Sequence, residues 1–504
     1  MAQFVDDINR KLIPRWRSSE LTIMLGEMAG PNGRPSAPGG IDDFDEKLRA
    51  WRANRKMSSA AELLAAGFVH SRLEESREGA EFILKSEDAT DLLRDLARRA
   101  VDAFELGDPD DDESAGSQIR RQRNVLSLEP RNPFKWVDLA RNHLLVGRPR
   151  KAKRAMDVAL QLAPDNRFVV RSATRLYLHL RQPDRAHHIL SSAASLLFDP
   201  ALVSAEIAVS ALMKNTSHLM RRGFQLLDSE SYPEAQLGEL SAVIATEELL
   251  HGSGRKVRKL FKRSLTRPNE NTVAQVRWAA SKTDGIPFDP KYLRVDRSFE
   301  ARAWAQFFQG EWGQALVQSR AWLSDQGFSK RPAALGSYIA AVVMEDHLEA
   351  IGILRRGLTA NPGDPLLLNN MAYSLACMGD ITAAESALQK MNITEDISPE
   401  ESLFITKLAT SGLIEYRKGN AEAGRSLYRR AVELSRSAGL DTVRARVIMF
   451  FALEEARSGT ALESPGLQMA IQAGTSSTDP VLRVLANRLI ELGRSRKAVD
   501  NPTK

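Results

Sequence analysis

The stretch from Asn132 to Asn166, NPFKWVDLARNHLLVGRPRKAKRAMDVALQLAPDN, constrains the fold more than any other part of the chain. Counting Pro133 as position 1, its notable positions are 4, 7, 8, 15, 20, 27 and 32, which hold Trp136, Leu139, Ala140, Gly147, Ala152, Ala159 and Pro164. Ala186 follows Ala152 after 34 residues, which puts Tyr177 at position 11 of a second unit. This spacing predicts that the chain repeats the unit. A chain of 504 residues is also longer than a single hydrophobic core usually supports, which favours several domains or a series of repeats.

This order of residues resembles the tetratricopeptide repeat, a helix–turn–helix unit of about 34 residues. Small residues at positions 8, 20 and 27 let two antiparallel helices approach closely, and the proline ends the second helix because it cannot continue the hydrogen-bond ladder. The resemblance covers roughly residues 130–440. It implies an all-α fold, a right-handed superhelical solenoid of antiparallel helix pairs with a helical N-terminal region, whose concave surface binds other molecules.

Four regions are expected along the chain. Residues 1–117 form a helical N-terminal region, which ends in the acidic linker Gly107–Ser114, a run that cannot bury itself. Residues 118–295 form a first array that is degenerate after residue 200, 296–440 form a second array, and 441–504 form capping helices and a polar tail. In the degenerate part, three weak helix pairs are indicated by prolines spaced 36, 33 and 35 residues apart: Pro164, Pro200, Pro233 and Pro268.

The repeat pattern returns clearly in the second array. Ala315, Ala350 and Ala384 occupy the position of Ala152, at steps of 35 and 34 residues. Glycines stand where the turns between paired helices are expected, at Gly310, Gly379 and Gly419. A terminal repeat needs a cap because its apolar face would otherwise meet water, which explains the helices expected after residue 440.

The composition excludes several other classes of protein. The single cysteine, Cys377, leaves no internal disulfide framework and no Cys-rich zinc site. No run of about 18 apolar residues predicts a membrane span, and the N-terminus has no apolar signal-peptide core, so a cytoplasmic location is expected. The net charge of +6 is mild for this length; it permits an acidic partner without requiring one.

In the tetratricopeptide family, certain first-helix positions point into the concave groove. In the first array these positions hold Arg141, Arg171 and Arg175, which implies a basic groove. Guanidinium groups suit carboxylates and phosphates because they donate paired hydrogen bonds in a plane. The groove would then capture an acidic peptide or chain end; the alternative is a basic helix face that is simply solvated.

The same positions of the second array give an aromatic groove with Trp304, Phe307, Asn369, Tyr373 and Tyr416 as partner-binding residues. Aromatic side chains often anchor interfaces, and an asparagine can hold a peptide backbone. The alternative is that Trp304, Phe307 and the adjacent Phe308 pack between repeats, since an aromatic stripe at helical spacing is usually core.

The densest basic run lies between residues 254 and 263. On a helix Val257, Leu260 and Phe261 share one face, and cations cover the rest: Arg255, Lys256, Arg258, Lys259, Lys262 and Arg263. Such a run suits the phosphates of a nucleic acid, although it is more often the exposed side of a packed helix.

No catalytic, cofactor or metal site is indicated, because the chain has no HExxH, no GK[ST] loop and no GxSxG. The sequence favours a non-catalytic scaffold or adaptor that binds a partner protein or peptide in the groove. Two alternatives stay open: a nucleic-acid-associated factor using residues 255–263 and the groove arginines, and a regulatory subunit docking on an enzyme through its N-terminal region. Self-association through the groove or a solenoid edge is also compatible with the pattern.

Overall fold

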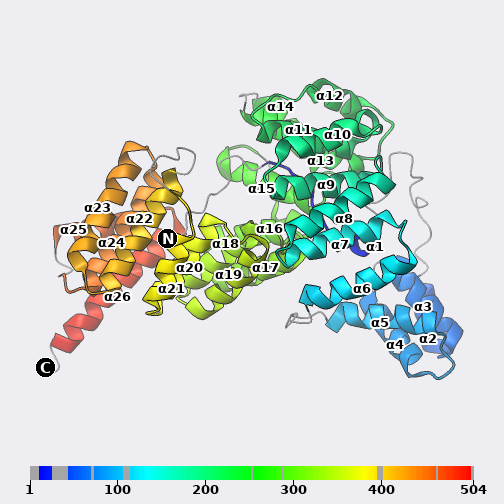
Figure 1. Cartoon of the computed structure of the whole chain (residues 1–504), viewed down its shortest axis with the longest axis horizontal. Coiled ribbons are helices and arrows are strands. Elements are labelled where there is room, and N and C mark those ends of the chain that lie inside the picture. Colours follow the sequence, from blue (N-terminus) through cyan, green and yellow to red (C-terminus); the bar gives the residue numbers. More distant parts are fainter. Residues whose placement is uncertain are drawn as a thin grey trace. The chain divides into compact units, whose positions relative to one another are not determined.

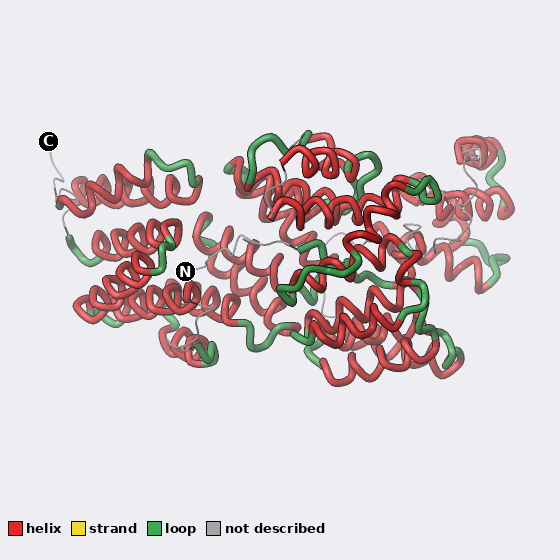
Figure 2. Tube along the Cα trace, turned by 90° about the horizontal axis from the view of Figure 1, so that it is seen from above, coloured by secondary structure: helices red, strands yellow, loops and turns green. Residues whose placement is uncertain are grey.

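The computed structural model describes residues 11–24, 44–69, 73–105, 114–250, 254–286, 288–393, 401–460 and 464–500. In these ranges the chain forms helices and no strands, so the expected all-α class is confirmed (Figure 2). Its contacts divide it into two units: unit 1 comprises residues 1–13, 144–148 and 207–504, and unit 2 comprises 14–143 and 149–206. Residues 107–113 of the expected acidic linker lie outside the described residues. The division of the chain into four regions remains a prediction.

Unit 2 contains the N-terminal helices and the repeat that begins at Pro133 (Figure 1). Its helices α2 to α5 pack each against the next around Phe44, Trp51 and Leu63. The full set is α1 (Ser19–Met24), α2 (Phe44–Ala53), α3 (Met57–Val69), α4 (Leu73–Lys85), α5 (Asp91–Glu105), α6 (Ser114–Leu128), most of α7 (Pro133–Leu145), α8 (Pro149–Leu162), α9 (Arg167–His179), α10 (Pro183–Ser192) and the 3-10 helix η1 (Leu196–Phe198).

Two helix pairs of unit 2 follow the repeat that the sequence predicted. The helices α9 and α10 begin at Arg167 and Pro183, each 34 residues after the helices α7 and α8 begin. Ala152 and Ala186 are fully buried, as expected of small residues where two helices approach closely. Asn166 caps α9, because its side chain accepts hydrogen bonds from the first backbone N–H groups of that helix. The predicted 34-residue period is thus confirmed.

Unit 1 is a longer series of helices (Figure 1). It begins within α11 (Pro200–Leu212) and continues through α12 (Met220–Asp228), α13 (Glu234–Leu250), α14 (Gly254–Ser264), α15 (Glu270–Lys282), the 3-10 helix η2 (Pro290–Arg294), α16 (Phe299–Gln309), α17 (Trp312–Asp325), α18 (Lys330–Tyr338), the π-helix η3 (Ile339–Val343), α19 (His347–Ala360), α20 (Pro365–Cys377), α21 (Ile381–Gln389), α22 (Glu401–Arg417), α23 (Ala421–Ser437), α24 (Asp441–Arg457), α25 (Pro465–Thr475) and α26 (Pro480–Asp500).

The contacts in unit 1 are those of stacked antiparallel helix pairs. From α15 onward each α-helix contacts the next one, and the alternate helices α18, α20, α22, α24 and α26 also contact one another in turn. Short turns join paired helices, and Gly310, Gly379 and Gly419 adopt positive φ values of 79°, 87° and 85° in them, a conformation that glycine reaches without steric cost. The third weak pair expected before residue 295 has α15 followed only by the short η2.

Candidate partner-binding surfaces

The three arginines assigned to a basic groove lie in unit 2, on α7 and α9, and all are half-buried. Arg171 donates a hydrogen bond of 3.1 Å to the carbonyl oxygen of Ala201. Arg141 lies near the buried carboxyl group of Asp138. Burial raises the pKa of Asp138 to about 6, whereas hydrogen bonds from Ser19 and the positive charge of Arg141 act to lower that pKa. These contacts tie two of the arginines to the unit, and a partner contact by any of the three, Arg175 included, remains a prediction.

The residues assigned to an aromatic groove lie in unit 1 and are mostly inaccessible. The side chain of Asn369 is fully buried and Phe307 is 2% exposed. Tyr373 and Tyr416 are also buried, and only Trp304 is half-buried. A partner can reach the four buried side chains only if neighbouring helices move. The part of all five residues in binding remains a prediction.

The helix α24 covers the tyrosines of this surface. The ring of Phe450 meets the ring of Tyr373 edge-on at 5.7 Å, and Tyr416 donates a hydrogen bond to Glu455. Burial raises the pKa of Tyr373 well above its ordinary value. The surface that the repeat pattern assigned to a partner therefore holds a helix of the chain itself.

A buried carboxylate joins α24 to α22. Glu454 is 3% exposed, and its two oxygens accept hydrogen bonds from both terminal nitrogens of Arg417, at 2.5 and 3.1 Å. Arg457 donates a third hydrogen bond of 2.6 Å to the same carboxylate. Removing one member of such a buried network leaves the others unpaired, which makes the contact costly to break.

The C-terminal helix α26 is held by the same network. Arg488 donates to the carbonyl oxygens of Val342 and Val343 in η3, at 3.0 and 3.1 Å. Its Nε lies 3.2 Å from the carboxylate of Glu345, which also pairs with Arg457 at 3.5 Å. The helix α24 is thus tied to α22, and α26 is tied to η3.

An aromatic patch on α15 and α16 stays open to solvent. Phe308 is 43% exposed, and its ring stacks on Trp304 at 5.9 Å and meets Phe307 edge-on at 5.5 Å. The guanidinium group of Arg277 lies 5.1 Å from the ring of Phe308 and donates a hydrogen bond of 2.8 Å to the carbonyl oxygen of Trp304. We call Arg277, Trp304 and Phe308 the aromatic patch.

The basic run forms the helix α14, which packs on α13. Its apolar face is buried at Val257, Leu260 and Phe261, as the sequence predicted. Two of its cations pair with acids of α13: Lys256 with Glu248 at 3.1 Å and Arg263 with Glu234 at 3.0 Å. In the described part of the chain, four others form no ion pair: Arg255, Arg258, Lys259 and Lys262.

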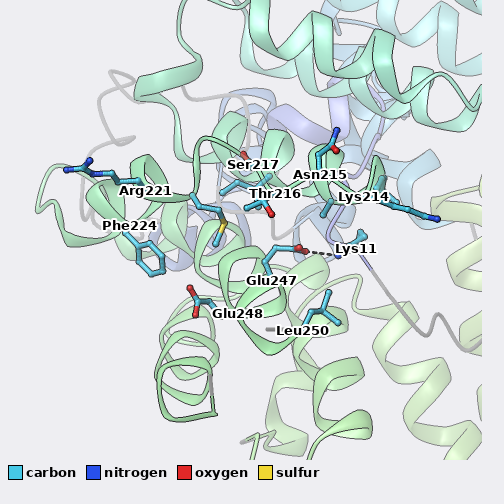
Figure 3. A pocket seen from close by; sticks show the side chains of 14 residues that line it. Lys11, Lys214, Asn215, Thr216, Ser217, Arg221, Phe224, Glu247, Glu248 and Leu250 are labelled. Atoms are coloured by element: carbon cyan, nitrogen blue, oxygen red, sulfur yellow. Dashed lines mark hydrogen bonds and ion pairs between the residues drawn. The ribbon is translucent and has the colours of Figure 1, made fainter. Parts of the chain in front are cut away.

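A cavity of about 820 Å³ opens beside this helix, within unit 1 (Figure 3). It is lined by the end of α11, the following turn, α12, the end of α13 and Lys11 of the N-terminal segment. The ammonium group of Lys11 lies 2.7 Å from the carboxylate of Glu247, and Asn271 donates a hydrogen bond to the carbonyl oxygen of Ile13. The sequence did not predict this cavity, because its walls come from segments far apart in the chain and carry no motif.

Two further features concern metals and membranes. Among the described residues no group of three or more His, Cys, Asp or Glu side chains is placed to hold a metal ion. None of the described helices combines the length and apolar character needed to cross a membrane.

No protein-family model matches the chain, and no curated protein matches it in sequence. Among solved structures it is similar to yeast Tom70, with 11% identity over 88% of this chain and 97% of that one, at a TM-score of 0.31. The APC/C hetero-tetramer Cut9-Hcn1 gives 14% identity, 89% and 92% coverage and a TM-score of 0.38. The human IFIT1 dimer with PPP-AAAA gives 14% identity over 90% of this chain and 96% of that one, at a TM-score of 0.32. At such low TM-scores these similarities carry no argument about function.

Proposed function

We propose that the chain is a non-catalytic scaffold or adaptor of the cytoplasm that binds a partner protein, in the manner of tetratricopeptide-repeat proteins. The observation that carries this proposal is the exposed ring of Phe308 in the aromatic patch. Aromatic residues and arginine dominate the binding energy of protein interfaces, and here they occur together on one face.

The patch is organised before any partner arrives. Trp304 and Phe307 hold the ring of Phe308 from two sides, and Arg277 is fixed by its bond to a backbone carbonyl. Because these side chains lose little freedom on binding, a partner that covers the exposed 43% of Phe308 gains about 1 kcal/mol of hydrophobic free energy with a small entropic cost.

A tagged pull-down from the native cell lysate, treated with nuclease and read by mass spectrometry, tests the proposal. Phe308→Ala is expected to lose a protein that the wild-type chain retains. Val317→Ala is the matched control, because Val317 is 59% exposed on the neighbouring helix α17 and lies outside the patch. If both variants retain the same proteins as the wild type, the aromatic patch is not the binding surface. The proposed function fails if the wild-type chain itself retains no specific protein.

The helix α14 favours nucleic-acid binding as the second candidate function, because four of its cations lack an ion pair among the described residues. Phosphate contacts release counterions, so binding through this helix should weaken steeply with added salt. A gel-shift titration with single-stranded RNA at two salt concentrations tests it. Lys259→Glu/Lys262→Glu should abolish salt-sensitive binding, and unchanged binding would exclude α14 as the contact.

A further inference from the structure

The cavity beside α14 has an apolar floor. Apolar side chains of the helices α11, α12 and α13 line it: Ile207, Ala211, Leu212, Met220, Phe224 and Leu250. Leu212 and Leu250 are each close to half exposed. Exposed apolar side chains that gather around one cavity mark it as a site where a bound group removes them from water.

The carboxylates of the cavity are neutralised by lysines of the same unit. Glu247 pairs with Lys11, and Glu248 pairs with Lys256, at 2.7 and 3.1 Å. By contrast, Lys214 and Arg221 form no ion pair with any residue that the structure describes. The lining therefore presents an excess of positive charge, and that excess is available to an acidic ligand.

The two unpaired cations stand on opposite sides of the cavity. Figure 3 shows the charged ends of Lys214 and Arg221 extending outward on either side, with Phe224, Glu247 and Leu250 between them. Lys214 has a φ of 60°, which a non-glycine residue seldom adopts. The turn imposes this value, since the backbone N–H of Lys214 bonds to the carbonyl oxygen of Ala211 at 3.1 Å as α11 ends.

We propose that this cavity binds a peptide segment of a partner protein in which a bulky apolar side chain is flanked on both sides by acidic residues. The apolar side chain enters the cavity, and the carboxylates reach Lys214 and Arg221. This inference rests on the proposed function, that the chain binds a partner protein, but it uses a surface separate from the aromatic patch.

The structure favours a peptide over a nucleic acid at this site. Single strands bind along a tract of cations with several aromatic rings on which bases stack. The cavity lining has one aromatic ring, Phe224, and the ammonium group of Lys256 already lies 3.9 Å from the centre of that ring. The remaining floor is aliphatic and suits an apolar side chain better than a base.

Selection from a random peptide display library on the immobilised full chain tests the inference. Peptides with Asp or Glu on both sides of Leu, Ile, Phe or Met are expected to be enriched. Selection on Lys214→Glu/Arg221→Glu should instead enrich peptides with Lys or Arg in those places. Enrichment without an acidic bias, or with the same bias on both proteins, would overturn the proposal.

An enriched peptide, labelled with fluorescein, then gives affinities by anisotropy. Lys214→Glu/Arg221→Glu should weaken binding at least about tenfold. Two controls should leave it unchanged: Lys390→Glu/Arg429→Glu, which makes the same charge change at exposed sites elsewhere in unit 1, and Val317→Ala, which truncates an exposed side chain of α17. Equal weakening by both charge reversals would overturn the proposal, as would tight binding of a single-stranded oligonucleotide that the peptide cannot displace.

The two proposals fail in different ways. If Phe308→Ala loses a protein in the pull-down while the library gives no acidic peptides, the scaffold function stands and the cavity inference falls. If the library behaves as expected while the pull-down is unaffected by Phe308→Ala, the aromatic patch falls and the cavity remains the binding surface.

Discussion

The surface around Tyr373 and the cavity around Phe224 lie in the same unit, but the first is covered by another helix and the second stays open. At Tyr373, α24 supplies Phe450, and Glu454 completes a buried network with arginines. At Phe224, the two carboxylates are neutralised, yet Lys214 and Arg221 form no ion pair within the described ranges. The difference shows that contacts from other parts of the chain, here from α24, decide whether a surface is covered or stays open.

The largest expected contrast between the two regions concerns their aromatic rings. Phe450→Ala should lower the free energy of unfolding by about 3–4 kcal/mol, because it opens a hole against the buried ring of Tyr373. Phe224→Ala should cost less than about 1 kcal/mol, since that ring is half-buried beside an open cavity. Urea denaturation followed by circular dichroism measures both.

A reversal of that order would break the comparison. If Phe224→Ala destabilises the protein as much as Phe450→Ala, the cavity floor is part of the packed core and is not a free site. Val317→Ala serves as the baseline, because an exposed side chain on α17 should change stability by less than about 0.5 kcal/mol.

The buried network should give a smaller contrast of the same kind. Glu454→Gln removes the charge that faces Arg417 and Arg457, and both arginines remain partly open to water. We therefore expect a loss of about 2–3 kcal/mol, below the full cost of breaking a buried pair. Glu248→Gln, which breaks a more exposed pair with Lys256, should cost less than about 1 kcal/mol. If Glu454→Gln costs no more than Glu248→Gln, the Glu454 network stabilises the protein no more than an exposed ion pair does.

The repeat architecture was predictable because its signal is local. Ala152 and Ala186 are fully buried at the predicted spacing, and Gly379 and Gly419 adopt the left-handed turns expected of them. Small residues, turn glycines and prolines act within a few residues of their own position, so their effect is readable from the sequence. The buried face of α14 followed for the same reason, since Val257, Leu260 and Phe261 recur at helical spacing.

The candidate binding surfaces were less predictable because they depend on contacts between distant segments. The repeat register assigned Tyr373 to a groove, but Phe450 lies 77 residues later, and nothing in the local pattern states that α24 returns to cover it. The cavity depends on Lys11 pairing with Glu247 across 236 residues. Trp304 and Phe307 lie together on α16, yet only packing determines that Phe307 is buried while Phe308 is exposed.

The smallest expected effect is a pH response from His347 in the Tyr373 region. His347 lies 6.1 Å from the ring of Tyr373, and burial lowers the pKa of His347 below its usual 6.5. Glu345 and Asp346 act to raise that pKa, while Arg457 and Arg488 act to lower it. The folded state therefore favours the neutral imidazole.

Because the unfolded chain takes up a proton on His347 first, stability should be fully present above about pH 6.5 and decline as the pH falls towards the lower folded pKa. His347→Asn should remove this part of the decline. Urea denaturation of both proteins between about pH 7.5 and about pH 5.5 measures the difference. Asp138, whose pKa is raised to about 6, has the opposite effect in this range, but it is present in both proteins and cancels. Identical pH profiles would show that protonating His347 costs the same in the folded and unfolded chains.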